Sequence, residues 1–366
     1  MQPRGRTGID DFEPYSPGLS IEEIKHRYGL SQVIKMASNE NPLGTSPVVR
    51  KALERSAAMA FRYPRAGSPS LRRTLAEHHS VDPANVVAGN GSDELIDLLI
   101  RVLAEPGRDN IVAFNPCFSI YTLQAKLCGV EFRQVELGRN FTFPWEKLRA
   151  RVDNDTALVF LTTPDNPSGY APPVEEVESF ARSLPERTTL VVDEAYMEFA
   201  VPLHGFSLLP RFREFSNLVI LRTFSKMYGL AGLRLGYGIM PHWIGDLLLR
   251  VKLPFSVNIL AEAAGKAALG DLPFFEATLK TVVEGRQFLS EALQGMGCTV
   301  YPTQANFLML RPPQDATTLF QALLERGIII RHLGSYGMPD FLRISIGTEE
   351  ENRMLVEVMG DMLGKE

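Results

Sequence analysis

Six short β-rich runs, several of them separated by segments with helical spacing, place the strongest constraint on the fold of this chain. The runs lie at 85–88, 110–114, 131–135, 157–161, 189–192 and 218–221. Neighbouring parallel strands need a long crossover connection, which is usually a helix. The alternation therefore predicts an α/β large domain, in which helices flank a mostly parallel sheet.

The pattern changes after about residue 253. Long helical segments at 258–269, 272–293 and 349–363 enclose only a few short strand candidates. This α+β pattern predicts a second, smaller domain, and a length of 366 residues also favours about two domains. We expect an N-terminal arm with part of the small domain at 1–45, a large cofactor-binding domain at 46–255, and the C-terminal small domain at 256–366.

The composition excludes several classes of protein. A net charge of −5 without basic stripes argues against a nucleic-acid partner. The three cysteines, Cys117, Cys128 and Cys298, have neither disulfide-framework nor zinc-ligand spacing, so we expect no metal and a reducing compartment. The chain has no signal-peptide core and no apolar run of membrane-spanning length, which predicts a cytoplasmic protein that does not bind membranes.

Polar residues follow the predicted strands at the points where the strands end. Open parallel sheets bind ligands at the carboxyl ends of their strands. The polar segments in question are 89–94, 115–118, 163–169, 193–196 and 223–226. Their convergence on one sheet edge predicts a single binding site there.

Lys226 follows the run at 218–221, together with Thr223 and Ser225, and Arg234 lies eight residues further on. Such a lysine is either a solvated surface residue or an amine held in a tight site, where it can form a Schiff base with a carbonyl compound. In the second case the hydroxyls and Arg234 would hold an anionic group. These residues alone leave both interpretations open.

The segment GNGSDE at 89–94 is a glycine-containing turn between a strand and a helix. It can form an anion site from backbone N–H groups and Ser92, or it can be a plain capped helix start. Glu94 occupies the last glycine position of the dinucleotide fingerprint GxGxxG, and GxxxxGK[ST] is absent throughout. A dehydrogenase and a nucleoside triphosphatase are therefore disfavoured.

Four further segments carry residues with alternative roles. Asp193 emerges from a buried strand and is either a helix cap or the partner of a protonated pyridine nitrogen. Tyr196 could donate to a phenolic oxygen, and Asn166 is either a turn former or a ligand contact. Phe118 and Tyr121 share one side of a helical first turn, so either ring could cover a flat ligand or belong to the core.

Arg343 lies inside an apolar strand pattern, FLRISIG, where an unpaired arginine would be costly. It forms either an internal salt bridge or a site for an anionic substrate group, and Arg331 is the second arginine of this region. Taken together, the residues supply an amine, an aspartate, donors for a ring oxygen, an aromatic cover and a phosphate cup. These are the parts that a pyridoxal phosphate site needs.

The chain resembles a known family in eight of its segments. The segments that carry the resemblance are SNENPLG, FRYP, GNGSDE, NPCFSIY, DNPSG, DEAY, TFSKMYGLAGLRLGYG and LRISIGT. They occur in the order seen in fold-type I pyridoxal phosphate-dependent aminotransferases, and they are most similar to those of histidinol-phosphate aminotransferases. The resemblance extends from about Tyr15 to the C-terminus.

The resemblance implies a role for each matching residue. Lys226 matches the lysine that forms the Schiff base and moves the proton, and Asp193 matches the partner of the pyridine nitrogen. Tyr196 and Asn166 match the donors to the ring oxygen, and Phe118 matches the stacking residue. The residues that match the phosphate cup are Gly91, Ser92, Asp93, Thr223, Ser225 and Arg234.

The resemblance also implies a homodimer with shared active sites. Tyr63 matches a tyrosine that reaches the phosphate of the neighbouring subunit's cofactor. Arg331 and Arg343 match arginines that bind substrate anions, and Tyr15 and Asn39 lie in segments that line the substrate pocket.

The implied activity is transamination between L-histidinol phosphate and 2-oxoglutarate, which gives imidazole acetol phosphate and glutamate in histidine biosynthesis. One alternative is the same fold acting on aromatic or other amino acids. A second is a related decarboxylase of a phosphorylated amino acid. A non-enzymatic sensor domain that binds the cofactor is disfavoured, because the chain carries no DNA-binding segment.

Overall fold

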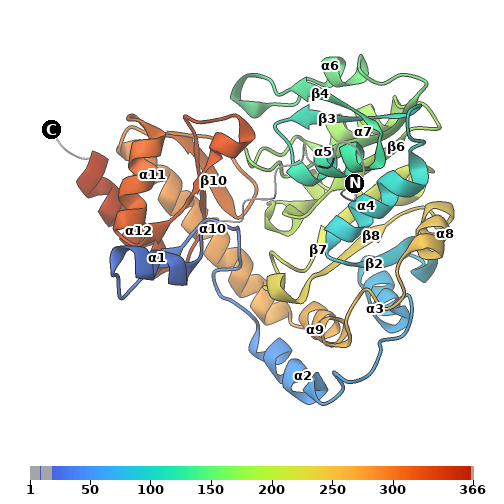
Figure 1. The fold of residues 1–366 in the computed structure, drawn as a ribbon, viewed down its shortest axis with the longest axis horizontal. Helices are drawn as coiled ribbons and strands as arrows, with labels where there is room; N and C mark the ends of the chain where they lie inside the picture. Colours follow the sequence, from blue (N-terminus) through green and yellow to red (C-terminus); the bar gives the residue numbers. More distant parts are fainter. Residues whose placement is uncertain (1–8, 10–18, 364–366) are drawn as a thin grey trace, which may run out of the picture.

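The computed structural model describes residue 9 and residues 19–363. Its large sheet has seven strands in the order β2-β8-β7-β6-β5-β3-β4 (Figure 1). The strands are β2 (Val86–Asn90), β3 (Asn110–Asn115), β4 (Glu131–Glu136), β5 (Thr156–Thr162), β6 (Thr189–Asp193), β7 (Leu218–Thr223) and β8 (Leu235–Ile239). The strands from β4 through β7 pair in parallel, which confirms the predicted α/β fold.

β8 is the antiparallel member of the sheet, between β7 and β2, and the sequence analysis did not predict it. Gly236 and Gly238 interrupt its apolar pattern, and glycine is unfavourable in most strands. The structure explains Gly236, since a Cβ atom there would lie 2.3 Å from the backbone nitrogen of Ser92. The close approach of another backbone is the usual reason for a glycine inside a strand.

Helices cover both faces of the sheet because successive strand residues point to opposite sides. In β7, Val219 and Leu221 pack in one apolar cluster and Leu218 and Ile220 in another. The helices α4 (Ser92–Leu103), α5 (Ser119–Cys128) and α8 (His242–Val251) contribute to the first cluster. The helices α2 (Pro47–Ala57), α3 (Pro69–His79), α6 (Trp145–Arg149), α7 (Val174–Arg182) and α9 (Ile259–Leu269) contribute to the second.

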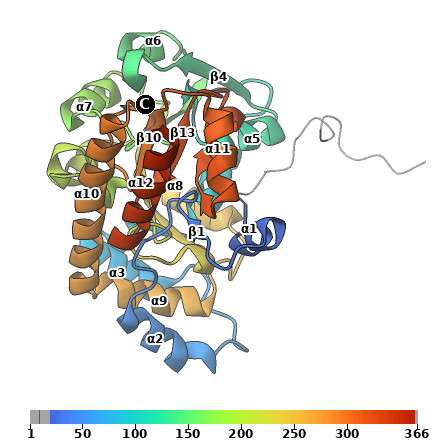
Figure 2. The same ribbon diagram turned by 90° about the vertical axis from the view of Figure 1, so that its left-hand side faces the viewer.

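The C-terminal part forms the predicted smaller α+β unit (Figure 2). Its antiparallel sheet has the order β12-β13-β10-β9, formed by β9 (Thr299–Val300), β10 (Phe307–Arg311), β12 (Arg331–His332) and β13 (Leu342–Ser345). The helices beside it are α10 (Leu272–Gly295), α11 (Ala316–Glu325) and α12 (Glu349–Leu363). Within residues 19–363, no helix combines the length and apolar character needed to span a bilayer.

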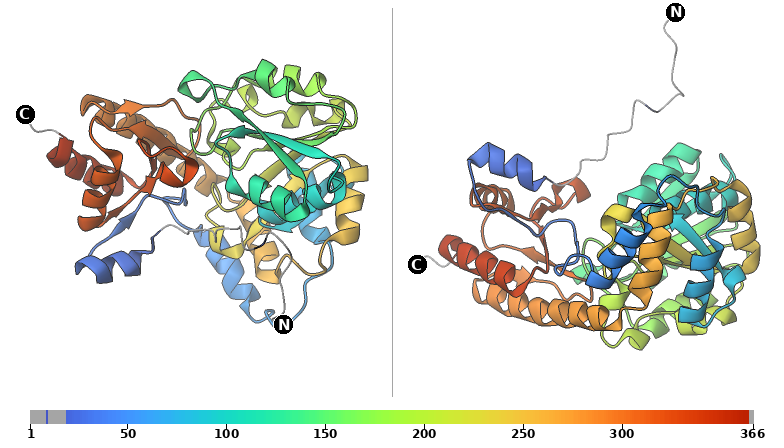
Figure 3. Two further views of the ribbon diagram at one scale, coloured as in Figure 1. Left: turned by 45° about the horizontal axis from the view of Figure 1, so that its top comes forward. Right: turned by 90° about the horizontal axis from the view of Figure 1, so that it is seen from below.

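The N-terminal segment packs on this C-terminal unit, where α1 lies beside α11 (Figure 3). Helix α1 (Ile21–Tyr28) is capped by Ser20 at its start and by Gly29 at its end. β1 (Ile34–Lys35) then pairs in parallel with β11 (Ile328–Ile329). The domain limits given above remain a prediction.

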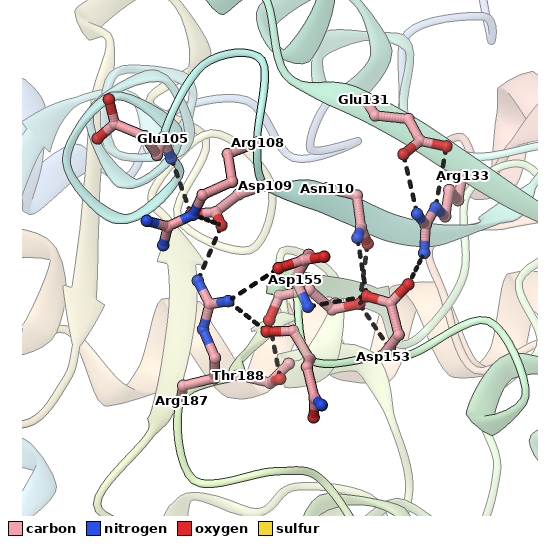
Figure 4. Close-up of polar contacts among 12 residues, drawn as sticks. Glu105, Arg108, Asp109, Asn110, Glu131, Arg133, Asp153, Asp155, Arg187 and Thr188 are labelled. Atoms are coloured by element: carbon pink, nitrogen blue, oxygen red, sulfur yellow. Dashed lines mark hydrogen bonds and ion pairs between the residues drawn. The ribbon is translucent and has the colours of Figure 1, made fainter.

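Ion pairs tie the strands of the large sheet together at the edge where the parallel strands begin (Figure 4). The Arg187 guanidinium donates to Asp109 over 2.9 Å. Arg133 on β4 donates to Asp153, which also accepts from the Asn110 amide over 3.0 Å. These contacts connect β3, β4 and the segments that lead into β5 and β6. The opposite edge is therefore the one left open for a ligand.

Candidate active site

The residues predicted from the strand ends meet at the carboxyl edge of the large sheet. They surround a cavity of about 540 Å³. Its lining includes Ser92, Asp93, Phe118, Asn166, Asp193, Tyr196, Thr223, Ser225, Lys226 and Arg234. Ten of the predicted site residues are thus brought together by the fold.

Lys226 lies in the loop after β7, and its Nζ donates to the carbonyl oxygen of Ser38 over 3.0 Å. The same nitrogen lies 5.7 Å from the centre of the Tyr196 ring. Burial, together with the nearby Arg343 guanidinium, lowers the pKa of Lys226 to about 8. The neutral amine is consequently far more populated near neutral pH than it would be in a solvated lysine. A neutral amine can act as nucleophile and as base.

Asp193 ends β6 and is buried, and within residues 19–363 its carboxylate forms no ion pair. Its Oδ2 accepts a hydrogen bond from the Tyr121 hydroxyl over 2.7 Å, and its Oδ1 accepts one from the Ala195 backbone over 3.2 Å. Burial raises the pKa of this carboxyl to about 6, because the two donors offset only part of the cost of desolvation. A cationic partner in the cavity would lower this pKa again and so favour the ionised form of Asp193.

Tyr121 has a role that sequence reasoning missed. Its ring packs edge-on to Phe118 with 5.8 Å between ring centres, and its hydroxyl lies between Asp193 and Thr162 Oγ1, at 2.8 Å from the latter. Tyr121 is fully buried, whereas Phe118 is half-buried and lines the cavity. The choice between the two rings is therefore resolved: Phe118 faces the cavity and Tyr121 supports the carboxylate.

Asn39 connects Tyr196 to the small domain. Its side-chain amide donates to the Tyr196 hydroxyl over 3.1 Å, and its backbone has a positive φ of 55°. Two small-domain side chains hold this backbone: Ser345 Oγ accepts from its N–H over 2.8 Å, and the Asn306 amide donates to its carbonyl over 3.0 Å. No sequence pattern indicated Ser345 or Asn306 as supports, because both are distant from Asn39 along the chain.

Arg343 on β13 is buried and reaches across to the large domain. Its Nη1 donates to Asn166 Oδ1 over 2.5 Å and its Nη2 to the Ala37 carbonyl over 3.0 Å, while its Nε has no partner among the described residues. Arg331 stands opposite it in the β12–β13 register. No carboxylate in the described part of the chain pairs with either guanidinium, which leaves both suited to an anionic ligand.

These two arginines and Asn39 line a second, smaller cavity of about 130 Å³. Phe118, Asn166, Tyr196 and Lys226 line both cavities, so the two spaces adjoin. A ligand at Lys226 can therefore contact the arginines with another part of its structure.

The far end of the large cavity is built for an anion. Gly91 precedes α4 with a φ of 76°, and its N–H donates to the Arg234 carbonyl over 2.9 Å. A Cβ at Gly91 would lie 2.7 Å from Arg234 Nη2, which already donates to Asp93 over 3.0 Å. The Thr223 hydroxyl accepts from the Ser225 N–H over 3.1 Å. A helix N-terminus, a guanidinium and hydroxyls in one place form a phosphate cup.

Among the described residues of the predicted site, Tyr63 lies apart from the others. Tyr63 is 82% exposed and stacks on Phe255, with 5.0 Å between ring centres. It therefore does not line the cavities of its own chain. Tyr15 falls outside the described residues.

Comparisons with known proteins agree with this arrangement. A model of the family "Aminotransferase class I and II" matches residues 31–359. The histidinol-phosphate aminotransferase of Nitratidesulfovibrio vulgaris strain Hildenborough is 59% identical over 98% of this chain and 96% of its own length. The enzyme of the same name from Oleidesulfovibrio alaskensis is 56% identical, over 98% of this chain and 94% of its own length.

Among solved structures, histidinol-phosphate aminotransferase from Sinorhizobium meliloti, in complex with pyridoxal-5'-phosphate, superposes with a TM-score of 0.88. The two chains are 27% identical, and the match covers 99% of each. The family model, the close relatives and the site geometry lead to the same assignment. This chain belongs to the class I and II aminotransferase family.

Proposed function

We propose that this protein transaminates L-histidinol phosphate with 2-oxoglutarate, giving imidazole acetol phosphate and glutamate, with pyridoxal phosphate as cofactor. The observation that carries the proposal is one cavity that holds both the Lys226 amine, whose pKa is lowered, and the buried Asp193 carboxylate, which has no ion-pair partner among the described residues. The name carried by relatives up to 59% identical supports the substrate. The reaction would serve histidine biosynthesis.

The residues fit the cofactor at each of its functional groups. Asp193 would pair with a protonated pyridine nitrogen, because such a cation removes the cost of its buried charge. Phe118 would cover the ring. Tyr196 and the Asn166 side-chain nitrogen would both bind the ring oxygen. The Asn166 nitrogen is the atom left for this role, because Asn166 Oδ1 already accepts a hydrogen bond from Arg343. The phosphate cup at Gly91 would take the phosphate. When bound, the cofactor supplies an electron sink for the bonds at substrate Cα.

Lys226 would move the proton in this reaction. Its Nζ would hold the cofactor covalently between turnovers and, once displaced by the substrate amine, would take the proton from substrate Cα. Its lowered pKa supports this role, because a base must be unprotonated at the working pH. Ser38 O, its acceptor at 3.0 Å, would orient the nitrogen lone pair toward the cavity.

Arg331 and Arg343 would bind the anionic ends of both substrates. Histidinol phosphate carries a phosphate and 2-oxoglutarate carries carboxylates, and a guanidinium fork binds either group with two parallel hydrogen bonds. Because both substrates would use one pocket in turn, the kinetics should be ping-pong.

We also propose a homodimer in which Tyr63 reaches the phosphate cup of the second subunit. The exposed apolar side chains around it support this: Phe61 is 74% exposed and Leu253 74%, and exposed apolar patches mark interaction surfaces. Sedimentation velocity should give twice the monomer mass. A monomer at micromolar concentration would contradict the proposal.

A cytoplasmic location is part of the same proposal. Its support is that Cys117, Cys128 and Cys298 form no disulfide within the described residues, as is usual in reducing compartments.

The test of the activity is a panel of amino donors ranked by kcat/KM with 2-oxoglutarate. We expect histidinol phosphate to rank first, ahead of phenylalanine, tyrosine and aspartate, with glutamate formed in equal amount to the keto product. A higher rank for an aromatic amino acid would assign the alternative substrate. Release of CO2 from a phosphorylated amino acid without 2-oxoglutarate would assign the decarboxylase alternative.

A further inference from the structure

A cluster of charged side chains lies buried behind the active-site edge of the large sheet. Arg222 is 3% exposed, Glu194 0% and Glu198 6%. The guanidinium donates from Nε to Glu194 over 2.8 Å, from Nη1 to Glu198 over 3.0 Å and from Nη2 to the Ser207 hydroxyl over 3.2 Å. All three guanidinium nitrogens are therefore engaged. None of these residues lines the two active-site cavities.

The cluster is adjacent in sequence to the residues that form the site. Arg222 immediately precedes Thr223 on β7, and Glu194 immediately follows Asp193 at the end of β6. Successive strand residues face opposite sides, so Arg222 lies on the face that carries Leu218 and Ile220, away from the cavity. The cluster thus contacts the site only through the backbone that carries it.

The backbone connections are short. The N–H of Glu194 donates to the Leu221 carbonyl over 2.9 Å, which continues the β6–β7 pairing to the strand ends. Glu198 belongs to the 3₁₀ turn Met197–Phe199, which begins directly after Tyr196. One guanidinium therefore holds two points of the segment that carries Asp193 and Tyr196, and fixes both to the strand that leads to Lys226.

A buried ion cluster of this kind stabilises little on balance, because desolvation of the charges offsets their attraction. Its value lies in geometry, since a planar fork with all donors engaged accepts only one arrangement of its partners. A reacting pair needs such control, because a displacement of about 1 Å can lower a rate about 100-fold.

We propose that Arg222 is a positioning residue, which sets the placement of Asp193 relative to Lys226 by clamping Glu194 and Glu198 to β7. The inference rests on the proposed function for its kinetic consequence. Its effect on cofactor affinity does not depend on which amine is the substrate.

The primary test is Arg222→Lys, which keeps the buried positive charge but loses the planar fork. Expected results are a dissociation constant for pyridoxal phosphate raised about 10-fold or more, and a kcat lowered about 100-fold with the KM for histidinol phosphate within about twofold. Arg250→Lys is the matched control, since Arg250 is an exposed arginine that pairs with Asp246 on the same helix. It should leave both quantities unchanged.

A second variant separates positioning from stability. Arg222→Met combined with Glu194→Gln and Glu198→Gln removes every charge of the cluster, and such replacements of buried ion clusters often preserve folding. We expect this variant to fold and still bind the cofactor about 10-fold more weakly, because no fork joins the two strands. Folding is checked by circular dichroism and a urea midpoint.

The proposal is overturned if either variant folds and then binds the cofactor as the unmodified protein does. It is also overturned if neither variant folds, since the cluster would then be required for folding itself. If the unmodified protein fails to transaminate histidinol phosphate, the proposed function is wrong, and cofactor affinity, measured without substrate, still decides this inference.

Discussion

Replacing Tyr121 with phenylalanine tests the argument that Asp193 depends on a single side-chain donor. The hydroxyl at 2.7 Å is the shorter of the two hydrogen bonds that Asp193 accepts, and the other comes from a backbone N–H at 3.2 Å. A hydrogen bond to a charged group contributes about 1.5–3 kcal/mol. Because the hydroxyl stabilises only the ionised carboxylate, its loss should raise the pKa of Asp193.

The expected size follows from linkage. One pKa unit corresponds to about 1.4 kcal/mol, so the lost hydrogen bond is equivalent to about 1–2 units. The pKa of Asp193 already stands at about 6 through burial. In Tyr121→Phe the carboxyl of the free enzyme should therefore stay protonated at neutral pH, where it cannot pair with a cation.

The assay is the pH dependence of pyridoxal phosphate binding to the cofactor-free protein. In Tyr121→Phe the acidic limb of the binding curve should move to higher pH by about 1–2 units, and affinity should recover as the pH is raised. Tyr28→Phe is the matched control, since its hydroxyl accepts from Gln321 at the surface. An acidic limb that stays in place, in a variant that folds normally and binds the cofactor, would refute the reasoning.

Three further outcomes follow from the site. Lys226→Ala should abolish transamination and covalent retention of pyridoxal phosphate, which a filtered protein sample would reveal by its absorbance; retained turnover would contradict the role of the amine. Arg343→Lys should raise the KM for 2-oxoglutarate about 10- to 100-fold with a smaller change in kcat, because one charged hydrogen bond of about 1.5–3 kcal/mol is lost; steady-state kinetics measure this, and an unchanged KM would contradict it. In the cofactor-free protein, the free energy of unfolding should rise between pH 8 and about pH 10.5, because the unfolded chain binds more protons than the folded one across this window when the pKa of Lys226 is about 8. Over this window, the free energy of unfolding from urea titrations should rise by at most about 3 kcal/mol more for this protein than for Lys226→Met. An equal rise in both proteins would refute the lowered pKa.

The parallel part of the fold could be predicted because β3, β5, β6 and β7 are nearly continuous apolar runs, as sheets covered on both faces require. β8 could not, since close contact with the start of α4 places Gly236 in it, and glycine is typical of turns. A sequence pattern records burial better than it records the approach of a distant backbone.

The site residues also divide into those that the sequence pattern predicts and those that depend on packing between distant segments. Lys226, Asp193 and Thr223 were predictable, because strand ends meet at one edge of a parallel sheet. The hydroxyl of Tyr121 under Asp193 depends on how α5 packs over β5 and β6, which spacing along the chain does not determine. The contacts of the Arg222 guanidinium could not be predicted either, because an arginine near the end of a predicted strand can lie on either face of the sheet.

Residues 37–39 join recognition to chemistry within three consecutive peptide units. The Ala37 carbonyl accepts from Arg343, the Ser38 carbonyl from Lys226, and the Asn39 amide donates to Tyr196. Strand β13 therefore cannot shift without displacing the acceptor of the lysine. The short segment that leads from β1 to α2 therefore connects the strand that carries Arg343 to the acceptor of the Lys226 amine.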